Sequence, residues 1–454
     1  MIIKEKILDK EIYIESRNGN FSFDIFEIID SSKYLDFDII DPNFEEYKSD
    51  SCTFSINLSN SCNLRCDYCF NKEKNNKSID LELVYGFLST CFEKFKDKEK
   101  FFVDLSGKGE PLLFLTKILA IKKYCDNISN KLNKEVLVSF VCNGTLLNEE
   151  ISSILQNHGI LFGVSIDGNE NIHDLHRKNI HGEGTYKGII NNVNSIASHE
   201  YVGCASTLTK QVFDLKESII ELSKTFNTIS YKPARKCEDS IDVYSIDLWK
   251  REYEKLTIFL LEESLKGNHK YIKTLLNGDD YFGKFLKRVI LNKRCIIRCD
   301  GGLTRLTLND DGKVYICPAA CNEEQFQIGD YKKIDENMQI NIYNLQKFRL
   351  ECRDCSIKYI CGGECLVEKS LSHGINTIMC KYKKHLSLLA IYFSYNLALK
   401  SPLNFKKLYM FCEEVINRGK SDEKLLKFIT KNKRKHNCTF IEFKKIYDKK
   451  NKRY

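Results

Sequence analysis

The sequence predicts an α/β fold built around a parallel sheet. Between residues 53 and 233, short apolar runs typical of strands alternate with amphipathic stretches typical of helices. Six such units favour parallel strands joined by right-handed crossovers, and six are too few to close an eight-stranded barrel. The chain of 454 residues also holds 20 cysteines, many of them grouped at short, regular spacings. These observations indicate an open parallel sheet that positions metal ligands.

The strand candidates are the apolar runs 53–58, 101–106, 135–142, 160–167, 201–208 and 228–233. Helices are expected between them, most clearly at 81–95, 115–128 and 185–197. Further along, the region 234–294 lacks motifs, and its periodicity indicates helices at 248–265 and 281–291. Ligands of parallel α/β sheets gather at the carboxyl ends of the strands, so functional motifs are expected where these runs end.

The first cysteine motif lies in Ser61–Phe70, which reads SCNLRCDYCF and follows the first strand. Cys62, Cys66 and Cys69 have C-x3-C-x2-C spacing. Three thiolates on one tight loop suit three corners of a [4Fe–4S] cluster, which leaves the fourth iron open to a small molecule. A zinc site would want a fourth Cys or His nearby, and none follows within the loop. Three unrelated buried thiols are the alternative, and the tight spacing disfavours it.

This loop resembles the signature of the radical S-adenosylmethionine (radical SAM) enzymes, C-x3-C-x-[aromatic]-C, with Tyr68 as the aromatic residue. The resemblance implies a partial (β/α)6 TIM-like barrel, in agreement with the six repeats. It also implies that the open iron binds the amino and carboxylate groups of SAM. Reductive cleavage of SAM then gives methionine and a 5′-deoxyadenosyl radical, with electrons from a low-potential donor, a flavodoxin or a ferredoxin.

The segment after the second strand carries a further motif of this family. Residues Ser106–Pro111 read SGKGEP, which resembles the family's GGEP, with Lys108 in place of the first glycine. The resemblance implies that the backbone beside Gly109 and the side chain of Glu110 meet the SAM ammonium. Taken alone, such a glycine-rich turn is a weak signal, and its distance from the cysteine loop strengthens it.

The third and fourth strands end in two more family-like motifs. The third ends in CNGT, similar to the family's TNGT, and places Asn143 at the expected cofactor site. The fourth ends at Ser165, with Arg177 after it; in the sulfatase-maturase branch the matching residues hold the SAM ribose and carboxylate. A helix N-cap is the alternative role for Ser165. His173 is expected to be a hydrogen-bonded interior histidine.

A second group of cysteines begins at Cys299 and continues through Cys317, spaced C-x12-G-x4-C within a hairpin that turns at Asp311-Gly312. Cys352, Cys355, Cys361 and Cys365 follow at C-x2-C-x5-C-x3-C spacing, and Cys380 comes last. The array resembles the SPASM domain, an auxiliary-cluster extension of radical SAM enzymes that act on peptides and proteins. A zinc ribbon is disfavoured because the ligands outnumber those of one four-cysteine site.

The SPASM resemblance implies two auxiliary iron–sulfur clusters. One would be held by Cys352, Cys355, Cys361 and Cys380, and the other by Cys299, Cys317 and Cys365. Two cysteines, Cys295 and Cys321, are candidates for a fourth ligand of the second cluster, and both stay open. Five others, Cys91, Cys125, Cys204, Cys412 and Cys438, are assigned to packing.

Composition and charge exclude several classes of protein. The 43% hydrophobic and 29% charged content is typical of a folded globular protein. The net charge of +8 is concentrated from Lys400 onward, where 17 Lys and Arg face 6 Asp and Glu. The pattern of an RNA-binding module is missing, so this basic segment is expected to be a solvated helical surface. With no signal peptide and no apolar run of about 18 residues, we expect a cytoplasmic protein without membrane or nucleic-acid partners.

Five parts follow from these patterns. Residues 1–50 are expected to form a strand-rich segment with a hairpin turn at Asn18-Gly19-Asn20, a candidate for a reduced form of the leader-binding module of related enzymes. Residues 51–234 are the radical SAM core, 235–294 a helical connector, 295–384 the SPASM extension and 385–454 a basic helical tail. Residues 385–399 are apolar enough to pack on the body of the protein.

The predicted activity is the maturation of a ribosomally made precursor peptide. In sulfatase maturases an aspartate that acts as general base follows the hairpin cysteine, and this chain has Pro318 there, which disfavours formylglycine formation. A thioether between a peptide cysteine and a carbon atom, as in sactipeptides and ranthipeptides, is favoured, because an open auxiliary iron could bind the thiolate. A carbon–carbon or other oxidative crosslink is the runner-up, and a metal-binding regulatory protein is the non-enzymatic alternative.

Overall fold

The computed structural model describes residues 2–15, 21–22, 51–72, 74, 77–196, 202–235, 237–347, 352–371 and 376–416. Its centre is a ten-stranded sheet in the order β13-β12-β11-β10-β4-β5-β6-β7-β8-β9. The six strands from β4 to β9 are all parallel. They are β4 (Ser51–Ile56), β5 (Lys100–Asp104), β6 (Glu135–Cys142), β7 (Leu161–Ser165), β8 (Gly203–Leu208) and β9 (Ile229–Pro233). The predicted six-stranded parallel sheet is confirmed.

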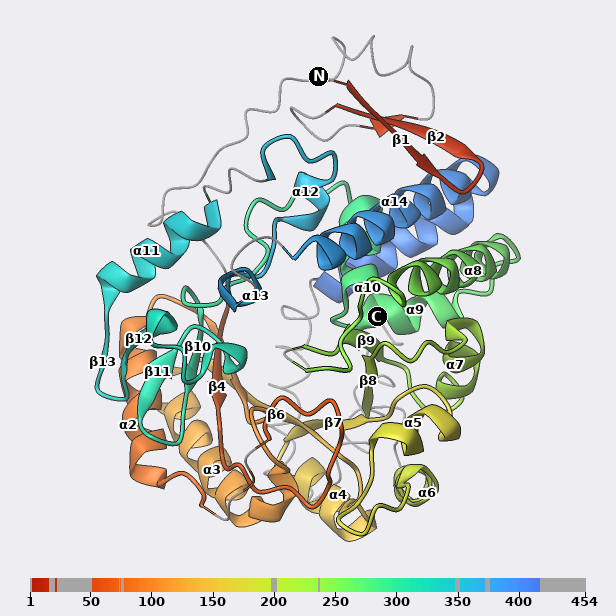
Figure 1. Cartoon of the computed structure of the whole chain (residues 1–454). Helices are drawn as coiled ribbons and strands as arrows, with labels where there is room; N and C mark the ends of the chain where they lie inside the picture. The colour runs from red at the N-terminus through yellow and green to blue at the C-terminus, as the bar shows by residue number, and fades with distance from the viewer. Residues whose placement is uncertain are drawn as a thin grey trace, which may run out of the picture.

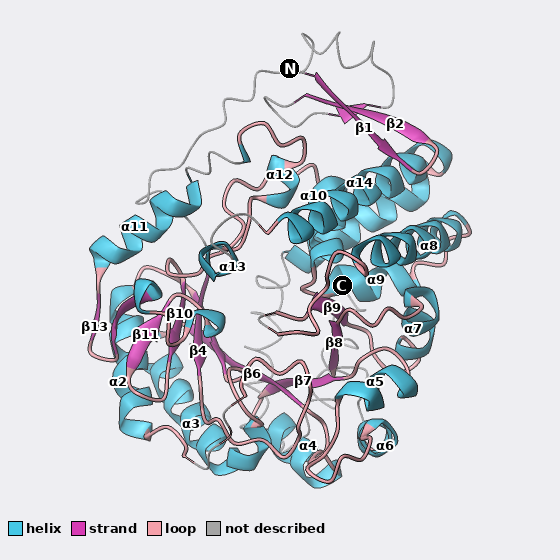
Figure 2. Ribbon diagram, in the orientation of Figure 1, coloured by secondary structure: helices cyan, strands magenta, loops and turns pink. Residues whose placement is uncertain are grey.

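Helices cover the outer side of these strands. They are α2 (Leu81–Lys94), α3 (Leu115–Leu132), preceded by the 3-10 turn η3 (Pro111–Phe114), α4 (Glu149–Asn157), α5 (Glu170–His176), α6 (Tyr186–Asn194) and α7 (Leu215–Leu222). Figure 1 shows the strands as an open arc, and the helices lie outside it. The arc does not close on itself, so the molecule has the expected partial barrel (Figure 2).

Aromatic packing explains why β4 lies at the centre of the sheet. Phe54 is fully buried, and its ring centroid lies 6.1 Å from that of Phe87, 5.7 Å from that of Phe92 and 5.8 Å from that of Phe101. Burial of such rings, with edge-to-face contacts, is among the largest stabilising contributions that single side chains make. The side chain of Asp80 accepts a hydrogen bond from Glu82 N and so fixes the start of α2.

The cysteine-rich extension continues the barrel sheet, which the sequence did not predict. Its strands are β10 (Arg305–Leu308), β11 (Lys313–Tyr315), β12 (Gln327–Asp330) and β13 (Lys333–Ile334). The hairpin turn at Asp311-Gly312 is confirmed, and Gly312 has the left-handed φ of +82° that such turns need. Strand β10 then pairs in parallel with β4, and Leu306 lies opposite Phe54. The extension therefore covers an edge that would otherwise be exposed.

Several helices pack beside the open part of the arc. The helices are α8 (Ile246–Leu265), α9 (Lys270–Asn277), α10 (Tyr281–Ile290), α11 (Glu336–Lys347), α12 (Lys358–Cys361), α13 (Leu366–Leu371) and α14 (Thr377–Lys400), with the 3-10 turns η5 (Pro318–Ala320) and η6 (Glu324–Phe326). Residues 402–416 are also helical. Helix α14 packs against α8 and α10, so the apolar segment 385–399 packs on the body as expected. Among the described helices, none is long and apolar enough to cross a membrane.

The N-terminal residues form a separate antiparallel sheet of β1 (Ile2–Ile7), β2 (Lys10–Glu15) and β3 (Phe21–Ser22). The pairing of β2 with β3 agrees with the expected hairpin, whose turn residues lie outside the described part of the chain. Glu5 accepts a hydrogen bond from Ser356 at 2.8 Å and pairs with Lys384 at 2.6 Å. These contacts hold the sheet against the cysteine-rich extension and α14.

Most of the cysteines assigned to packing are buried. Cys91, Cys125 and Cys412 are fully buried, and Cys204 is 3% exposed. Cys438 and the rest of the basic tail from residue 417 lie outside the described residues. The division of the chain into five parts stays a prediction, and the shared sheet shows that the core and the extension are joined through β4 and β10.

We expect Leu306→Ala to lower the free energy of unfolding of the whole molecule by roughly 2–5 kcal/mol, because Leu306 is fully buried on β10. The control is Leu399→Ala on α14, where the side chain is 67% exposed and the change should stay within about 0.5 kcal/mol. Chemical denaturation followed by tryptophan fluorescence measures both. Equal stability of the two variants would contradict the structural role of the β10–β4 pairing.

Candidate active site

The three cysteines of the first motif lie on the loop after β4, at the carboxyl end of the sheet. Cys62, Cys66 and Cys69 are all partly exposed. The Sγ of Cys62 lies 3.5 Å from the backbone nitrogen of Leu64, which donates to it, and Lys74 Nζ lies 3.4 Å from the Sγ of Cys69. Burial raises the pKa of the Cys62 thiol, and the hydrogen bond from Leu64 N offsets part of this effect. Metal binding to Cys62 must therefore displace its proton.

The Ser106–Pro111 segment packs directly against this loop. Gly109 has φ +73°, and a Cβ atom there would lie 2.3 Å from the carbonyl oxygen of Ser61 and 2.6 Å from that of Ser59. The next residue, Glu110, donates its backbone N–H to the same Ser61 oxygen at 2.8 Å. Only glycine tolerates both the left-handed backbone and the close approach, so Gly109 fixes the two motifs against each other.

Glu110 connects this segment to the end of β6. Its side chain is 2% exposed and accepts hydrogen bonds from Leu112 N at 3.0 Å and from Asn143 N at 2.7 Å. Burial raises the pKa of Glu110 to about 7. The side-chain Nδ2 of Asn143 in turn donates a hydrogen bond to Asn63 Oδ1 at 2.8 Å and lies 4.0 Å from the Sγ of Cys62. The structure thus brings together the predicted residues Gly109, Glu110 and Asn143 beside the cysteine loop.

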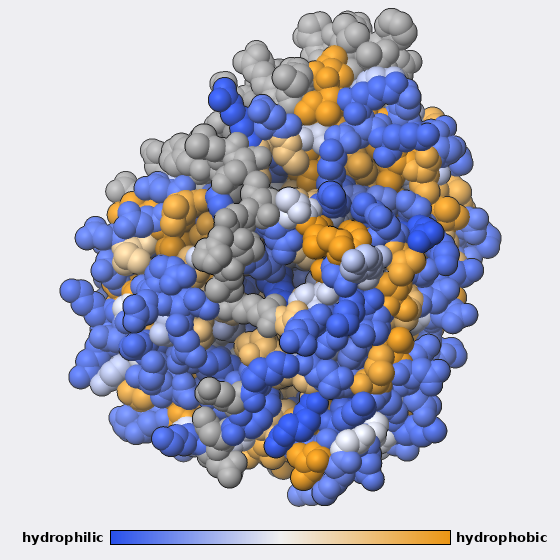
Figure 3. Space-filling model, viewed as in Figure 1, coloured by the Kyte–Doolittle hydropathy of each residue, from blue (hydrophilic) through white to orange (hydrophobic). Residues whose placement is uncertain are grey.

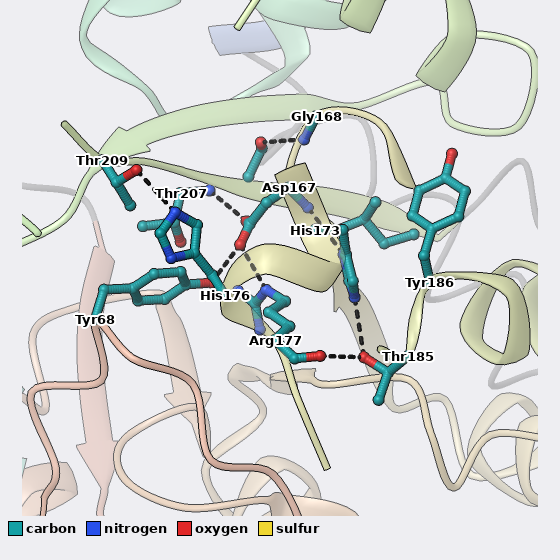
Figure 4. A network of polar contacts seen from close by, with 12 residues as sticks. Tyr68, Asp167, Gly168, His173, His176, Arg177, Thr185, Tyr186, Thr207 and Thr209 are labelled. Carbon is teal, nitrogen blue, oxygen red and sulfur yellow. Dashed lines mark hydrogen bonds and ion pairs between the residues drawn. The ribbon is translucent and has the colours of Figure 1, made fainter. Parts of the chain in front are cut away.

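A buried carboxylate that sequence reasoning missed lies on the other side of the loop. Asp167, just after β7, is fully buried and accepts hydrogen bonds from the Tyr68 hydroxyl, from Arg177 Nε at 2.8 Å and from Thr207 N at 2.7 Å (Figure 4). Its place in the Ser165–Gly168 motif was visible in the sequence. The sequence does not show that Tyr68 and Arg177 both contact the Asp167 carboxylate.

The ring of Tyr68 is held by two consecutive residues at the end of α5. The His176 ring centroid lies 5.5 Å from the Tyr68 centroid, and the Arg177 guanidinium carbon lies 5.4 Å from it. His176 also makes a 3.1 Å hydrogen bond to the Thr209 hydroxyl. Burial raises the pKa of Tyr68 well above its usual value, so the hydroxyl stays protonated and can donate to Asp167.

The two remaining residues of this region with a role predicted from the sequence are His173 and Ser165. His173 is buried, accepts from Asp167 N at 3.3 Å and lies 3.1 Å from the Thr185 hydroxyl, so it is the hydrogen-bonded interior histidine that we expected. The N-cap of α5 is Asn169 and not Ser165, whose capping alternative is therefore wrong. Ser165 is partly buried at the carboxyl end of β7.

Several cysteines of the extension lie near one another. Burial, with Cys365 and Cys299 close by, raises the pKa of the Cys317 thiol to about 12. Burial, with Cys361 and Cys352 nearby, raises the pKa of Cys380 to about 11, and Cys361 likewise lies near Cys355. The Gly301 N–H donates to the Cys299 sulfur at 3.4 Å. The tertiary structure therefore gathers cysteines that are up to 66 residues apart in sequence.

The two further candidates, Cys295 and Cys321, lie in different surroundings. Cys295 N donates to the carbonyl oxygen of Tyr359, and its Sγ would lie 2.5 Å from a Cβ atom at Gly362. The Sγ of Cys321 lies 3.3 Å from Asn57 Nδ2, at the end of β4. One thiol is thus beside α12 and the other beside the barrel, and the fourth-ligand question stays open between them.

A comparison with protein families matches residues 56–209 to the radical SAM superfamily. Residues 56–209 are a radical SAM domain. The match begins at the last residue of β4 and ends just after β8, so it contains the cysteine loop, Glu110 and Asp167. A radical SAM domain implies a [4Fe–4S] cluster and SAM, and the cysteine loop supplies the three thiols that such a cluster needs.

Similar proteins extend the likeness beyond this domain. The chain is 23% identical over 330 residues to a serine-type anaerobic sulfatase-maturating enzyme of Klebsiella aerogenes, covering 67% of this chain and 77% of that protein. It is 25% identical over 358 residues to the cysteine-type enzyme of Clostridium novyi, covering 71% of this chain and 90% of that protein. These relatives indicate that the protein is an enzyme.

Among solved structures, native anSMEcpe with bound AdoMet and Kp18Cys peptide superposes with a TM-score of 0.62 at 19% identity, over 77% of this chain and 99% of that one. At this level of identity the likeness shows the fold. It confirms the partial barrel, and the cysteine-rich C-terminal part of this chain joins the same sheet.

The cysteine loop fits a cluster better than a single metal ion. Within the described residues, no three His, Cys, Asp or Glu side chains lie close enough to hold one ion. Each thiolate of an iron–sulfur cluster binds a different iron, so a cluster needs its cysteines near one another but not at one point. Burial raises the pKa of Cys66 to about 11, so binding of the cluster must displace this proton.

We expect Asp167→Asn to lower the free energy of unfolding of the cluster-free protein by roughly 3–5 kcal/mol, because it leaves the buried Arg177 without its ion-pair partner. The control is Asp67→Asn, whose 47% exposed carboxylate lies 3.6 Å from His176 and should matter by less than about 0.5 kcal/mol. Urea titration of both variants checks this. If both lost the same stability, the proposed anchoring role of Asp167 would be wrong.

The pKa of Glu110 predicts a pH dependence of folding. An unfolded glutamate ionises near 4.5, whereas Glu110 keeps its proton up to about 7 in the folded protein. Its contribution to stability is therefore present at low pH and is lost as the pH rises through this window. Between pH 5 and pH 8 the loss should be roughly 2–3 kcal/mol.

Glu110→Gln does not titrate, so it should lack this part of the pH dependence. The measurement is the difference in the free energy of unfolding between pH 5 and pH 8, for wild type and variant without SAM or iron. Identical differences would show that Glu110 ionises normally.

Proposed function

We propose that the protein is a radical SAM peptide maturase that installs a crosslink, a cysteine thioether, in a ribosomally made precursor peptide. The observation that carries the proposal is the arrangement after β11. Cys317 gathers with Cys299 and Cys365 and is followed by Pro318, which begins η5. A trio of thiols leaves one iron of a cluster without a cysteine ligand, on the condition that neither Cys295 nor Cys321 supplies it. The residue directly after Cys317 has no carboxylate that could act as a base.

In the SAM site, this proposal gives each residue beside the cysteine loop a role. Cys62, Cys66 and Cys69 would hold the cluster. The Gly109 backbone and Glu110 would receive the SAM ammonium, which a partly ionised, buried carboxylate attracts strongly. The walls of the SAM site would be formed by Tyr68, Asn143, Ser165 and Arg177. Two of these residues, Tyr68 and Arg177, both contact Asp167, so their side chains would need little reorganisation when SAM binds.

In the extension, the two cysteine groups would hold two auxiliary clusters. Cys352, Cys355, Cys361 and Cys380 would complete one by themselves. Cys299, Cys317 and Cys365 would hold the other, with one iron free for a substrate thiolate. Thiolates are preferred ligands of iron–sulfur centres, so a peptide cysteine bound there would be deprotonated and held in place.

When bound, the clusters and SAM supply electron transfer and hydrogen-atom abstraction. In the net reaction a C–H bond and an S–H bond of the peptide break, and a C–S bond forms. SAM is the oxidant: it is split into methionine and 5′-deoxyadenosine, and one proton is released. The residues of this chain would orient the peptide and keep other C–H and S–H groups, which could donate a hydrogen atom to the radical, away from it.

The space-filling view is consistent with a peptide substrate. The face shown in Figure 1 is hollowed near its centre, and the side chains visible in the hollow are largely hydrophilic (Figure 3). A peptide bound to anSMEcpe in a structure of similar fold supports a peptide as the partner. The electron donor in this proposal is a flavodoxin or a ferredoxin.

Formylglycine formation is the second candidate, because the similar curated proteins are sulfatase-maturating enzymes. Pro318 disfavours it, since proline carries no base. A carbon–carbon or other oxidative crosslink is compatible with the same site and differs only in the atom that traps the carbon radical.

The test uses reconstituted protein, a chemical reductant, SAM and cysteine-containing peptides encoded near the gene. We expect a product that is lighter by two hydrogen atoms, retains its sulfur and no longer reacts with iodoacetamide, as measured by mass spectrometry. The Cys62→Ala, Cys66→Ala, Cys69→Ala triple variant should give neither this product nor 5′-deoxyadenosine. A sulfur-free product that reacts with hydrazides would instead establish formylglycine formation, and a product with a free thiol would indicate another crosslink.

A further inference from the structure

Among the described residues, two cations of the extension have no ion-pair partner: Lys383, which is buried, and Arg298, which is half-buried and has a buried Nη1 atom. We call Arg298 and Lys383 the buried cation pair. Lys383 is 1% exposed, and within the described part of the chain neither its Nζ nor the buried Nη1 of Arg298 has a hydrogen-bond partner. Both cations lie over the ring of Tyr281, with Arg298 Cζ at 5.0 Å and Lys383 Nζ at 5.9 Å from its centroid.

The buried cation pair lies between the two cysteine groups of the extension. Arg298 precedes Cys299, and its backbone N–H donates to Gly362 O at 3.2 Å, next to Cys361. Lys383 lies on α14 one helical turn after Cys380, so the two side chains share a face of the helix. Helices α10, α12 and α14, which carry or adjoin these residues, pack on one another (Figure 1).

One other cation of this region already has an anionic partner, and a buried carboxylate lies near Cys380. Arg235 donates to the Tyr281 hydroxyl at 2.7 Å and pairs with Glu368 at 3.0 Å. The Glu364 carboxylate accepts a hydrogen bond from Asn376 N at 2.8 Å. An aromatic ring offsets only part of the cost of burying a cation. Arg298 and Lys383 therefore mark a place where negative charge is expected when the protein is complete.

We propose that the buried cation pair supplies the counter-charge for the auxiliary iron–sulfur clusters and sets their reduction potential. This inference rests on the proposed function, because it requires that the two cysteine groups bind clusters. A cluster with thiolate ligands is negatively charged, and its potential depends on net charge and on nearby hydrogen bonds. Positive charge beside it stabilises the reduced form, which is the form that must exist after the cluster accepts an electron.

The test compares Lys383→Met with two matched variants in the Cys62→Ala, Cys66→Ala, Cys69→Ala background, where only auxiliary clusters remain. Lys381→Met removes the same charge from an exposed position on the same helix, one residue after Cys380. Lys383→Arg keeps the charge. Iron content and redox titration followed by electron paramagnetic resonance are the readouts.

We expect Lys383→Met to lower the ratio of reduced to oxidised cluster at a fixed potential at least tenfold, about 59 mV for a one-electron couple. Arg298→Gln should act in the same direction, whereas Lys381→Met and Lys383→Arg should match the background protein. A second readout is the free energy of unfolding of the iron-free protein, which the substitution should increase. Without iron, Lys383→Met should be more stable than its parent, because it removes an uncompensated buried charge.

Three results would overturn the inference. Unchanged potentials in Lys383→Met and Arg298→Gln, at full iron content, would refute the counter-charge role alone. Unchanged potentials with weakened binding of the precursor peptide would assign the pair to a peptide carboxylate. If the background protein itself bound no iron, the auxiliary clusters of the proposed function would be wrong, and the inference would fall with them.

Discussion

The buried carboxylate of Asp167 is the point on which the geometry of the radical SAM site depends. It receives hydrogen bonds from Tyr68 on the cysteine loop, from Arg177 at the end of α5 and from the backbone of Thr207 on β8. Three segments that are separate in sequence are therefore held by two oxygen atoms in an environment with little solvent. Because such an ion pair costs much to bury and more to break, the loop has one well-defined position relative to the sheet.

The Ser106–Pro111 segment fixes the same loop from its other side. Gly109 permits an approach to Ser59 and Ser61 that a side chain would prevent, and Glu110 reaches across to the backbone of Asn143. The cysteine loop is thus held between β5 and β6 on one side and β7 and β8 on the other. A site of this kind is preorganised, so the binding energy of a cofactor is not consumed in ordering the protein.

The pairing of β10 with β4 gives the cysteine-rich extension a fixed relation to the barrel. Parallel pairing places the carboxyl ends of both strands at the same edge, so Asn57 after β4 and Asn309 after β10 meet at 3.0 Å. The hairpin cysteine Cys317 follows two residues after β11. A substrate positioned by the extension would therefore face the edge of the sheet at which the radical SAM motifs lie.

How much could be predicted from the sequence differs from element to element. The bounds of β6 and the start of α2 agree with the apolar runs, because burial and capping there are local properties. The end of β7 did not agree. The chain leaves the sheet two residues early, where Asp167 turns its carboxylate to partners on other segments. The SPASM resemblance already implied the grouping of Cys317 with Cys299 and Cys365, and in the folded chain these two cysteines lie close to Cys317.

The sequence by itself determined the parallel α/β class, the cysteine loop and its family, since these depend on local periodicity and on the spacing of a few residues. Only the tertiary structure decided that the extension shares the barrel sheet and that Asp167 anchors Tyr68 and Arg177. It also decided that, among the described residues, the buried atoms Arg298 Nη1 and Lys383 Nζ have no hydrogen-bond partner. The physical reason is that the free-energy cost of a buried charge or of an unpaired strand edge depends on the groups that surround it. Those surroundings come from residues distant in sequence: Tyr68 and Asp167 are 99 positions apart, and Arg305 on β10 pairs with Thr53 on β4.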